Sequence, residues 1–177
     1  QADETAVLGA NFGLPQCAAD LFRLGDHLRI RVLSVVVIHR DLVAEAVANP
    51  IVVSLSRTKE PDIERAIRAV EKAKRPGIHV FIATSDIHLK HKLMMSRQEV
   101  IDAAGWAIGF AKKHLDYIEF SAEDASRSDR DYLVTVFGEV VRAGAVTLNV
   151  PDTTGYALPH QTSELFRYLI ANTPGGQ

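Results

Sequence analysis

The chain has 177 residues, of which 47% are apolar and 24% charged, and its formal net charge is −2. This is the composition of a soluble globular domain with a sizeable core, and it favours neither nucleic acid nor an anionic membrane surface as a partner. No apolar stretch approaches the roughly 20 residues that span a bilayer. The single cysteine, Cys17, excludes an internal disulfide and fits a reducing compartment.

The first 49 residues are the least regular part of the sequence, and we expect them to belong to the same domain as the rest. Their pattern favours a helix over 18–24, a strand over 28–38 and a short helix over 41–48. These elements would add one or two strand–helix units to the chain.

From residue 51 onward, strand-like and helix-like segments alternate. Apolar runs rich in β-branched residues predict strands at 51–55 and near the starts of 78–85, 117–124 and 146–153. Helical spacing predicts helices after Thr58, from Ser96 to about 114, over 129–142 and over 159–171. Thr58 is a candidate N-cap, and Ser96 with Glu99 forms a capping box. A polar loop is expected after Ser85.

This repeating pattern predicts an α/β fold with parallel strands joined by right-handed crossovers. It suits a (β/α)-barrel or a doubly wound sheet, and both gather their chemistry at the carboxyl ends of the strands. Polar residues follow three of the predicted strands at that end. The sequence therefore predicts a small-molecule enzyme site there.

Alternation places the candidate residues of each strand on one face, because successive side chains point to opposite sides of a sheet. The candidates are His79 and Phe81 on the first of the three strands, Glu119, Ser121 and Glu123 on the second, and Asn149, Pro151 and Thr153 on the third. Structural alternatives stay open for each set: a hydrogen-bonded core histidine, solvated loop residues or caps at Glu123 and Asp124, and an Asn149 that only ties neighbouring strands together.

Other features carry less chemistry. His88 and His91 have the spacing of a metal pair but lack a third ligand, so we expect a solvated lysine-rich loop or a contact for a phosphate-bearing substrate. The segment Thr153-Thr154-Gly155 could cradle an anion with its backbone amides. Cys17 has no neighbouring base, and no dinucleotide, P-loop or GxSxG motif is present.

Four motifs together resemble the 2-isopropylmalate synthase family. They are Ser54-Leu55-Ser56-Arg57, the run from His79 to Lys90 that reads HVFIATSDIHLK, the run from Glu119 to Ala125 that reads EFSAEDA, and Leu148-Asn149-Val150-Pro151-Asp152-Thr153 with Gly155-Tyr156. The resemblance implies a (β/α)8 TIM-type barrel and an acyltransferase that condenses acetyl-CoA with 2-oxoisovalerate in leucine biosynthesis. It also implies a divalent metal, Mg²⁺ or Mn²⁺, that polarises the ketone. A homo-oligomer in the bacterial cytoplasm or plastid stroma is expected.

By the same resemblance, eight residues fall at substrate-binding positions. They are Leu55, His79, Phe81, Ser121, Glu123, Asn149, Pro151 and Thr153. Thr153 matches the family position that hydrogen-bonds the 2-oxo acid carboxylate. Leu55 is expected to shape the space for the branched side chain.

Departures from the family pattern define the remaining expectations. Nothing in residues 1–49 matches the family's opening Asp-Thr-Thr-Leu-Arg-Asp-Gly-Glu, and no His-x-His is present, so no metal ligand or catalytic residue is assigned. Residues 50–177 are therefore interpreted as the middle βα units of an incomplete barrel, inactive alone. Two alternatives stay open: a related synthase of the citramalate, homocitrate or methylthioalkylmalate type, and a non-enzymatic partial barrel that acts as a binding module.

Overall fold

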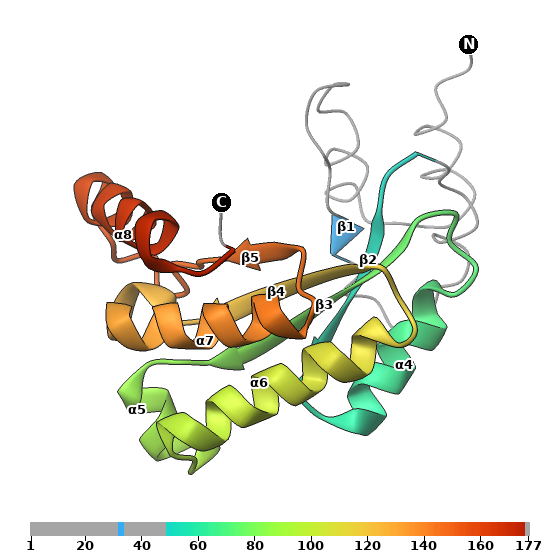
Figure 1. Cartoon of the computed structure of the whole chain (residues 1–177), viewed down its shortest axis with the longest axis horizontal. Coiled ribbons are helices and arrows are strands. Elements are labelled where there is room, and N and C mark those ends of the chain that lie inside the picture. The colour runs from blue at the N-terminus through green and yellow to red at the C-terminus, as the bar shows by residue number, and fades with distance from the viewer. Residues whose placement is uncertain (1–31, 34–48, 176–177) are drawn as a thin grey trace.

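The computed structural model describes residues 32–33 and 49–175, which contain five parallel strands in one sheet (Figure 1). The strands are β1 (Val32–Leu33), β2 (Val52–Arg57), β3 (Pro76–Ala83), β4 (Tyr117–Glu123) and β5 (Thr147–Asn149). The helices are α4 (Glu60–Val70), α5 (Asp86–His88), α6 (Arg97–Lys112), α7 (Arg130–Ala143) and α8 (Pro159–Asn172), with a π-helical turn at Leu89–Leu93 and a 3₁₀ turn at Ala125–Arg127.

The strands are ordered β1-β2-β3-β4-β5, so each pairs in parallel with its neighbours along the chain. This sequential order is that of a barrel, because a doubly wound sheet reverses its strand order part-way. Helices α4, α6 and α7 all lie on the same face of the sheet (Figure 1). The predicted class is confirmed: these are parallel strands of a TIM-type barrel, with fewer than eight strands in the described part.

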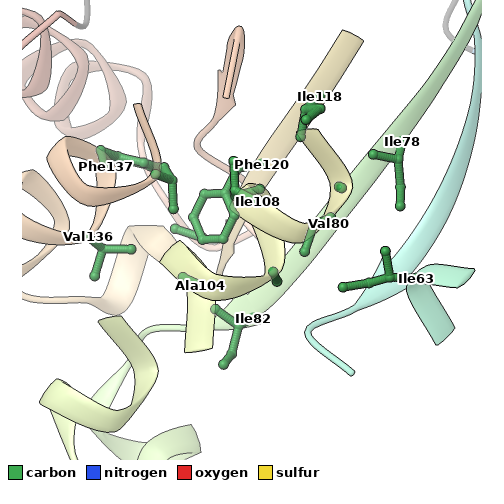
Figure 2. Packing of buried hydrophobic residues seen from close by; sticks show 14 of the residues in the cluster. Ile63, Ile78, Val80, Ile82, Ala104, Ile108, Ile118, Phe120, Val136 and Phe137 are labelled. Carbon is green, nitrogen blue, oxygen red and sulfur yellow. The ribbon is translucent and has the colours of Figure 1, made fainter. Parts of the chain in front are cut away.

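The core lies between the sheet and these helices, and period-two alternation builds it. Ile78, Val80 and Ile82 of β3 and Ile118 and Phe120 of β4 are almost completely buried. Figure 2 shows them packed with side chains of the covering helices, which include Ile63, Ala104, Ile108, Val136 and Phe137. The Phe120 and Phe137 rings meet edge to face, with centroids 6.2 Å apart. Burial of this one sheet face fixes which residues the opposite face presents.

Local capping signals mark the starts of α6 and α7 but not the start of α4. The capping box of Ser96 and Glu99 opens α6 as predicted, and Asp129 caps α7 through a 2.8 Å bond from the Tyr132 amide. The prediction of Thr58 as a cap is wrong. Lys59 is the N-cap of α4 and caps with no side-chain bond, while Thr58 is buried one residue earlier. Packing of Thr58 against the interior overrides its local capping preference.

The predicted loop after Ser85 is instead helical. Helix α5 continues directly into the π-helical turn, which ends at Met94 with a positive φ of 54°. Leu89 is buried beneath this turn, and Arg97 clamps Asp86 with bonds of 2.8 and 3.0 Å. The sequence suggested a loop because this segment is polar, and one buried residue, Leu89, does not produce the repeating apolar spacing that indicates a helix.

Of the elements predicted in the first 49 residues, only β1 falls among the described residues, inside the strand expected over 28–38. The helices predicted over 18–24 and 41–48 lie outside them.

Candidate functional site

The strand register places the candidate residues on the sheet face opposite α4, α6 and α7. Leu55 pairs with His79, and Phe81 pairs with Ser121, which in turn pairs with Asn149. The neighbouring residues of β3 and β4 face the helices and form the core. The alternation argument is confirmed for β3 and β4, whose candidate residues form adjacent rows on one surface. On the last strand it holds for Asn149 alone, because β5 ends there and Pro151 and Thr153 lie beyond it. In a barrel this surface is the lumen.

His79 lies at the centre of a polar network on this face. Its Nε2 atom is 2.6 Å from the Ser121 hydroxyl, and its Nδ1 atom is 3.9 Å from a carboxylate oxygen of Glu119. The Asn149 amide donates to the same Ser121 oxygen at 2.8 Å. Glu119 is only 2% exposed. A carboxylate on a central strand is expensive unless it is paired, and the histidine beside it reduces that cost.

A second cluster centres on Asp124, which directly follows β4 and is fully buried. Its carboxylate accepts bonds from the Ser85 hydroxyl at 2.5 Å, from His88 Nδ1 at 2.9 Å and from Arg127 at 2.8 Å. Burial by itself would raise the pKa of Asp124, but these hydrogen bonds and the Arg127 charge outweigh it, and the pKa is lowered. The reading of Asp124 as a solvated loop residue is wrong.

The backbone at Asp124 also positions Thr153. Asp124 adopts a left-handed conformation with φ of 65°, and its amide donates to the Thr153 hydroxyl oxygen at 2.9 Å. A hydroxyl has one proton and two lone pairs, so a Thr153 that accepts here keeps its proton for an acceptor elsewhere. Thr153 is thereby prepared to donate to an anionic ligand such as a carboxylate.

Glu123 extends from the last position of β4 and is partly buried. Lys92, from the π-helical turn, binds both of its carboxylate oxygens at 2.6 and 2.8 Å. The lysine-rich segment therefore contributes one charge to the strand end rather than standing wholly in solvent. The sequence did not predict this ion pair.

The remaining candidates line two hollows. Leu55 and Phe81 line one of about 230 Å³ together with Arg57 of β2. Pro151 lines a larger one of about 490 Å³ between the end of β5, the start of α7 and α8, where Asp152 and Arg127 also lie. The backbone amide of Ala157, bonded at 2.8 Å, is the main cause that lowers the pKa of Asp152. The structure thus brings His79, Ser121 and Asn149 into direct contact and leaves Leu55 and Pro151 beside separate hollows.

The described residues do not fit a metal centre. They contain no group of three or more histidine, cysteine, aspartate or glutamate side chains that could hold a metal ion. His88 directs Nδ1 at Asp124 and Ser85, so the His88 and His91 pair is committed in part to the buried cluster. In the same part of the chain, no helix is both long and apolar enough to cross a membrane.

A sequence profile described as HMGL-like matches residues 37–177. The chain belongs to the HMGL-like family. Among similar family proteins is the 2-isopropylmalate synthase of Chromobacterium violaceum, which is 54% identical over 134 residues, covering 76% of this chain and 26% of that protein. The chloroplastic 2-isopropylmalate synthase 2 of Arabidopsis thaliana is 50% identical, over 76% of this chain and 23% of its own length. The family resemblance read from the motifs is confirmed.

The fold agrees with that of a solved structure. Hydroxymethylglutaryl-CoA lyase from Pseudomonas aeruginosa matches with a TM-score of 0.62 and 15% identity, over 77% of this chain and 47% of that one. At this identity the match shows the fold alone. The chain spans about a quarter of the length of the curated relatives that it matches.

Proposed function

We propose that this chain forms the middle βα units of a barrel that condenses acetyl-CoA with 2-oxoisovalerate, the reaction of 2-isopropylmalate synthases. The observation that carries the proposal is the row of His79, Ser121 and Asn149, joined by hydrogen bonds across three strands on the face opposite α4, α6 and α7. Relatives about 50% identical, all named 2-isopropylmalate synthase, support the same assignment.

The roles of the residues follow from their chemistry. Thr153 donates a hydrogen bond to the 2-oxo acid carboxylate, because the Asp124 amide takes one lone pair of its oxygen and leaves the hydroxyl proton available. Leu55 and Phe81 supply apolar surface for the branched side chain. Glu123 and the His79 row form the remaining wall, and Pro151 lines the separate hollow beside Asp152 and Arg127. Positioning of this kind lowers the barrier by holding the reactants in a productive arrangement.

A divalent metal, Mg²⁺ or Mn²⁺, would supply Lewis-acid polarisation of the ketone in this reaction. The described residues offer it no set of ligands, so we derive no step of the reaction through it. We therefore expect that the chain binds the 2-oxo acid but does not turn it over alone. In the cell we expect acetyl-CoA as the second substrate, a homo-oligomeric assembly, and a location in bacterial cytoplasm or plastid stroma.

Binding of 2-oxoisovalerate to the full chain, measured by calorimetry, tests the pocket. Thr153→Val should weaken binding at least ~10-fold, since one hydrogen bond to a charged group is worth about 1.5–3 kcal/mol. The neighbouring exposed Thr154 is the matched control, and Thr154→Val should leave binding unchanged. Equal loss in both variants, or no binding by the unmodified chain, would overturn the proposal.

Release of coenzyme A by the chain with acetyl-CoA, 2-oxoisovalerate and Mg²⁺ tests the expectation that the chain does not turn over its substrates alone. We expect no release from a folded chain. Turnover would show that residues outside the described part provide the metal and electrophilic groups. A panel of other 2-oxo acids separates the related synthases, because one methylene in an apolar pocket is worth only about 1–3 kcal/mol. A chain that binds none of them would favour the non-enzymatic binding module.

A further inference from the structure

The contacts around Ser121 constrain where its single proton can lie. A serine hydroxyl donates one hydrogen bond and accepts two. The Asn149 amide group donates to Ser121 Oγ at 2.8 Å and therefore occupies one acceptor position. The other close contact is His79 Nε2, at 2.6 Å. Ser121 either donates a hydrogen bond to Nε2 or accepts one from a protonated Nε2, and the two cases require different tautomers of His79.

The far side of the imidazole decides between them. Glu119 places a carboxylate oxygen 3.9 Å from His79 Nδ1. A nearby negative charge favours a proton on the ring nitrogen that faces it. A neutral imidazole carries only one such proton on its two nitrogens. With that proton on Nδ1, Nε2 presents a lone pair. The hydroxyl of Ser121 must then donate to it.

We propose that Ser121 and Asn149 are positioning residues that hold neutral His79 as the Nδ1–H tautomer. The two hydrogen bonds then run in one direction, from Asn149 to Ser121 and from Ser121 to His79 Nε2. The proton on Nδ1 faces the Glu119 carboxylate at 3.9 Å, which is an electrostatic contact and not a hydrogen bond. All four residues lie on the lumen face of adjacent strands, and His79 is only 6% exposed. The site would present to a ligand an imidazole of fixed orientation. That this ligand is a 2-oxo acid substrate rests on the proposed function, whereas the tautomer of His79 does not.

The tautomer can be measured without any ligand. Long-range ¹H–¹⁵N correlation spectra of the full chain, labelled on its seven histidines, report which ring nitrogen is protonated. The His79→Gln variant identifies the His79 signals by their loss. We expect a protonated Nδ1 and a bare, hydrogen-bonded Nε2 wherever the ring is neutral. A neutral ring with its proton on Nε2, or a ring doubly protonated at every pH at which the chain is folded, would overturn the proposal.

Variants test whether Asn149 and Ser121 set this state. Asn149→Asp replaces a donor by an acceptor, so Ser121 must reverse and a proton should appear on Nε2. Ser121→Ala should shift the Nε2 resonance toward that of an unbonded nitrogen, and Ser121→Thr should restore it. Thr147→Val changes a polar residue of the same strand that bonds to Tyr117 instead, and should change neither signal.

An unchanged His79 in Asn149→Asp or in Ser121→Ala would contradict the assigned roles. If Asn149→Asp fails to fold, the unmodified chain and the Ser121 pair still decide the matter. Because no substrate or turnover enters these measurements, their failure is distinct from a failure of the proposed function.

Discussion

The amide of Asp124 donates to the Thr153 hydroxyl at 2.9 Å and so ties the end of β4 to the segment that follows β5. The Asp124 side chain meanwhile binds Ser85 and His88, which follow β3. One buried residue thus holds three strand ends together. The position of the Thr153 hydroxyl therefore depends on Asp124, although the Asp124 carboxylate itself binds none of the predicted substrate-binding residues.

Loss of the Asp124 charge should destabilise the fold. We expect Asp124→Asn to lower the free energy of unfolding at neutral pH by about 1–3 kcal/mol, because buried charge-assisted bonds to Arg127 and Ser85 are weakened. Urea unfolding at neutral pH measures this value. Asp116→Asn is the control, since the Asp116 side chain is fully exposed, and it should stay within about 0.5 kcal/mol of the unmodified chain.

The same variant should show a defined pH dependence. The pKa of Asp124 is lowered in the folded chain, so its contribution is present above the unfolded value of about 3.9 and is lost as pH falls through the folded value. The difference in unfolding free energy between Asp124→Asn and the unmodified chain should therefore shrink below about pH 4. A difference that stays constant down to pH 2 would contradict the role of the carboxylate charge.

Two glycines should respond to alanine with opposite signs. Gly144 ends α7 with φ of 115°, and a Cβ there would lie 3.1 Å from Lys112 Cγ, so Gly144→Ala should destabilise by more than about 1 kcal/mol. Gly109 lies inside α6 with open space around it, and Gly109→Ala should stabilise by about 0.5–1 kcal/mol. Thermal unfolding of both variants checks the signs, and equal effects would argue against this account of Gly144.

The capping box of α6 should contribute measurably to stability. The Ser96 hydroxyl accepts a hydrogen bond from the Glu99 amide at 3.3 Å, and the Glu99 carboxylate accepts one from the Ser96 amide at 2.7 Å. We expect Ser96→Ala to cost about 1 kcal/mol of unfolding free energy. Gln98→Ala, on the same exposed turn, is the control and should cost less than about 0.5 kcal/mol. Equal urea midpoints for the two variants would contradict a capping role.

Core packing predicts a contrast between two isoleucines. Ile118 is completely buried on the helix face of β4, whereas Ile170 of α8 is 54% exposed. Ile118→Val should lower the free energy of unfolding by about 0.5–1.5 kcal/mol, and Ile170→Val should change it by less than about 0.5 kcal/mol. Chemical denaturation measures both. A larger cost at Ile170 would mean that another surface covers α8 in solution.

Local patterns determined a large part of this structure. Period-two alternation put His79 and Phe81 on one face of their strand and Glu119 and Ser121 on one face of theirs, because successive side chains of a strand point to opposite sides. The capping box was predicted correctly at Ser96 and Glu99, where the bonds join residues three apart. The family motifs lie on the same strand ends. The parallel fold class and the polar surface were therefore predictable from the sequence by itself.

Only the tertiary structure revealed the contacts that give those residues their state. Ser85 and Asp124 are 39 positions apart, Glu123 and Lys92 are 31 apart, and His79 and Ser121 are 42 apart. Hydrogen bonds act over about 3 Å, and no local period records which distant side chain arrives within that range. The sequence determined which residues share a surface. The packing of strands β3, β4 and β5 decided that Asp124 is a buried hub and that His79 faces a carboxylate, because only folding brings those atoms together.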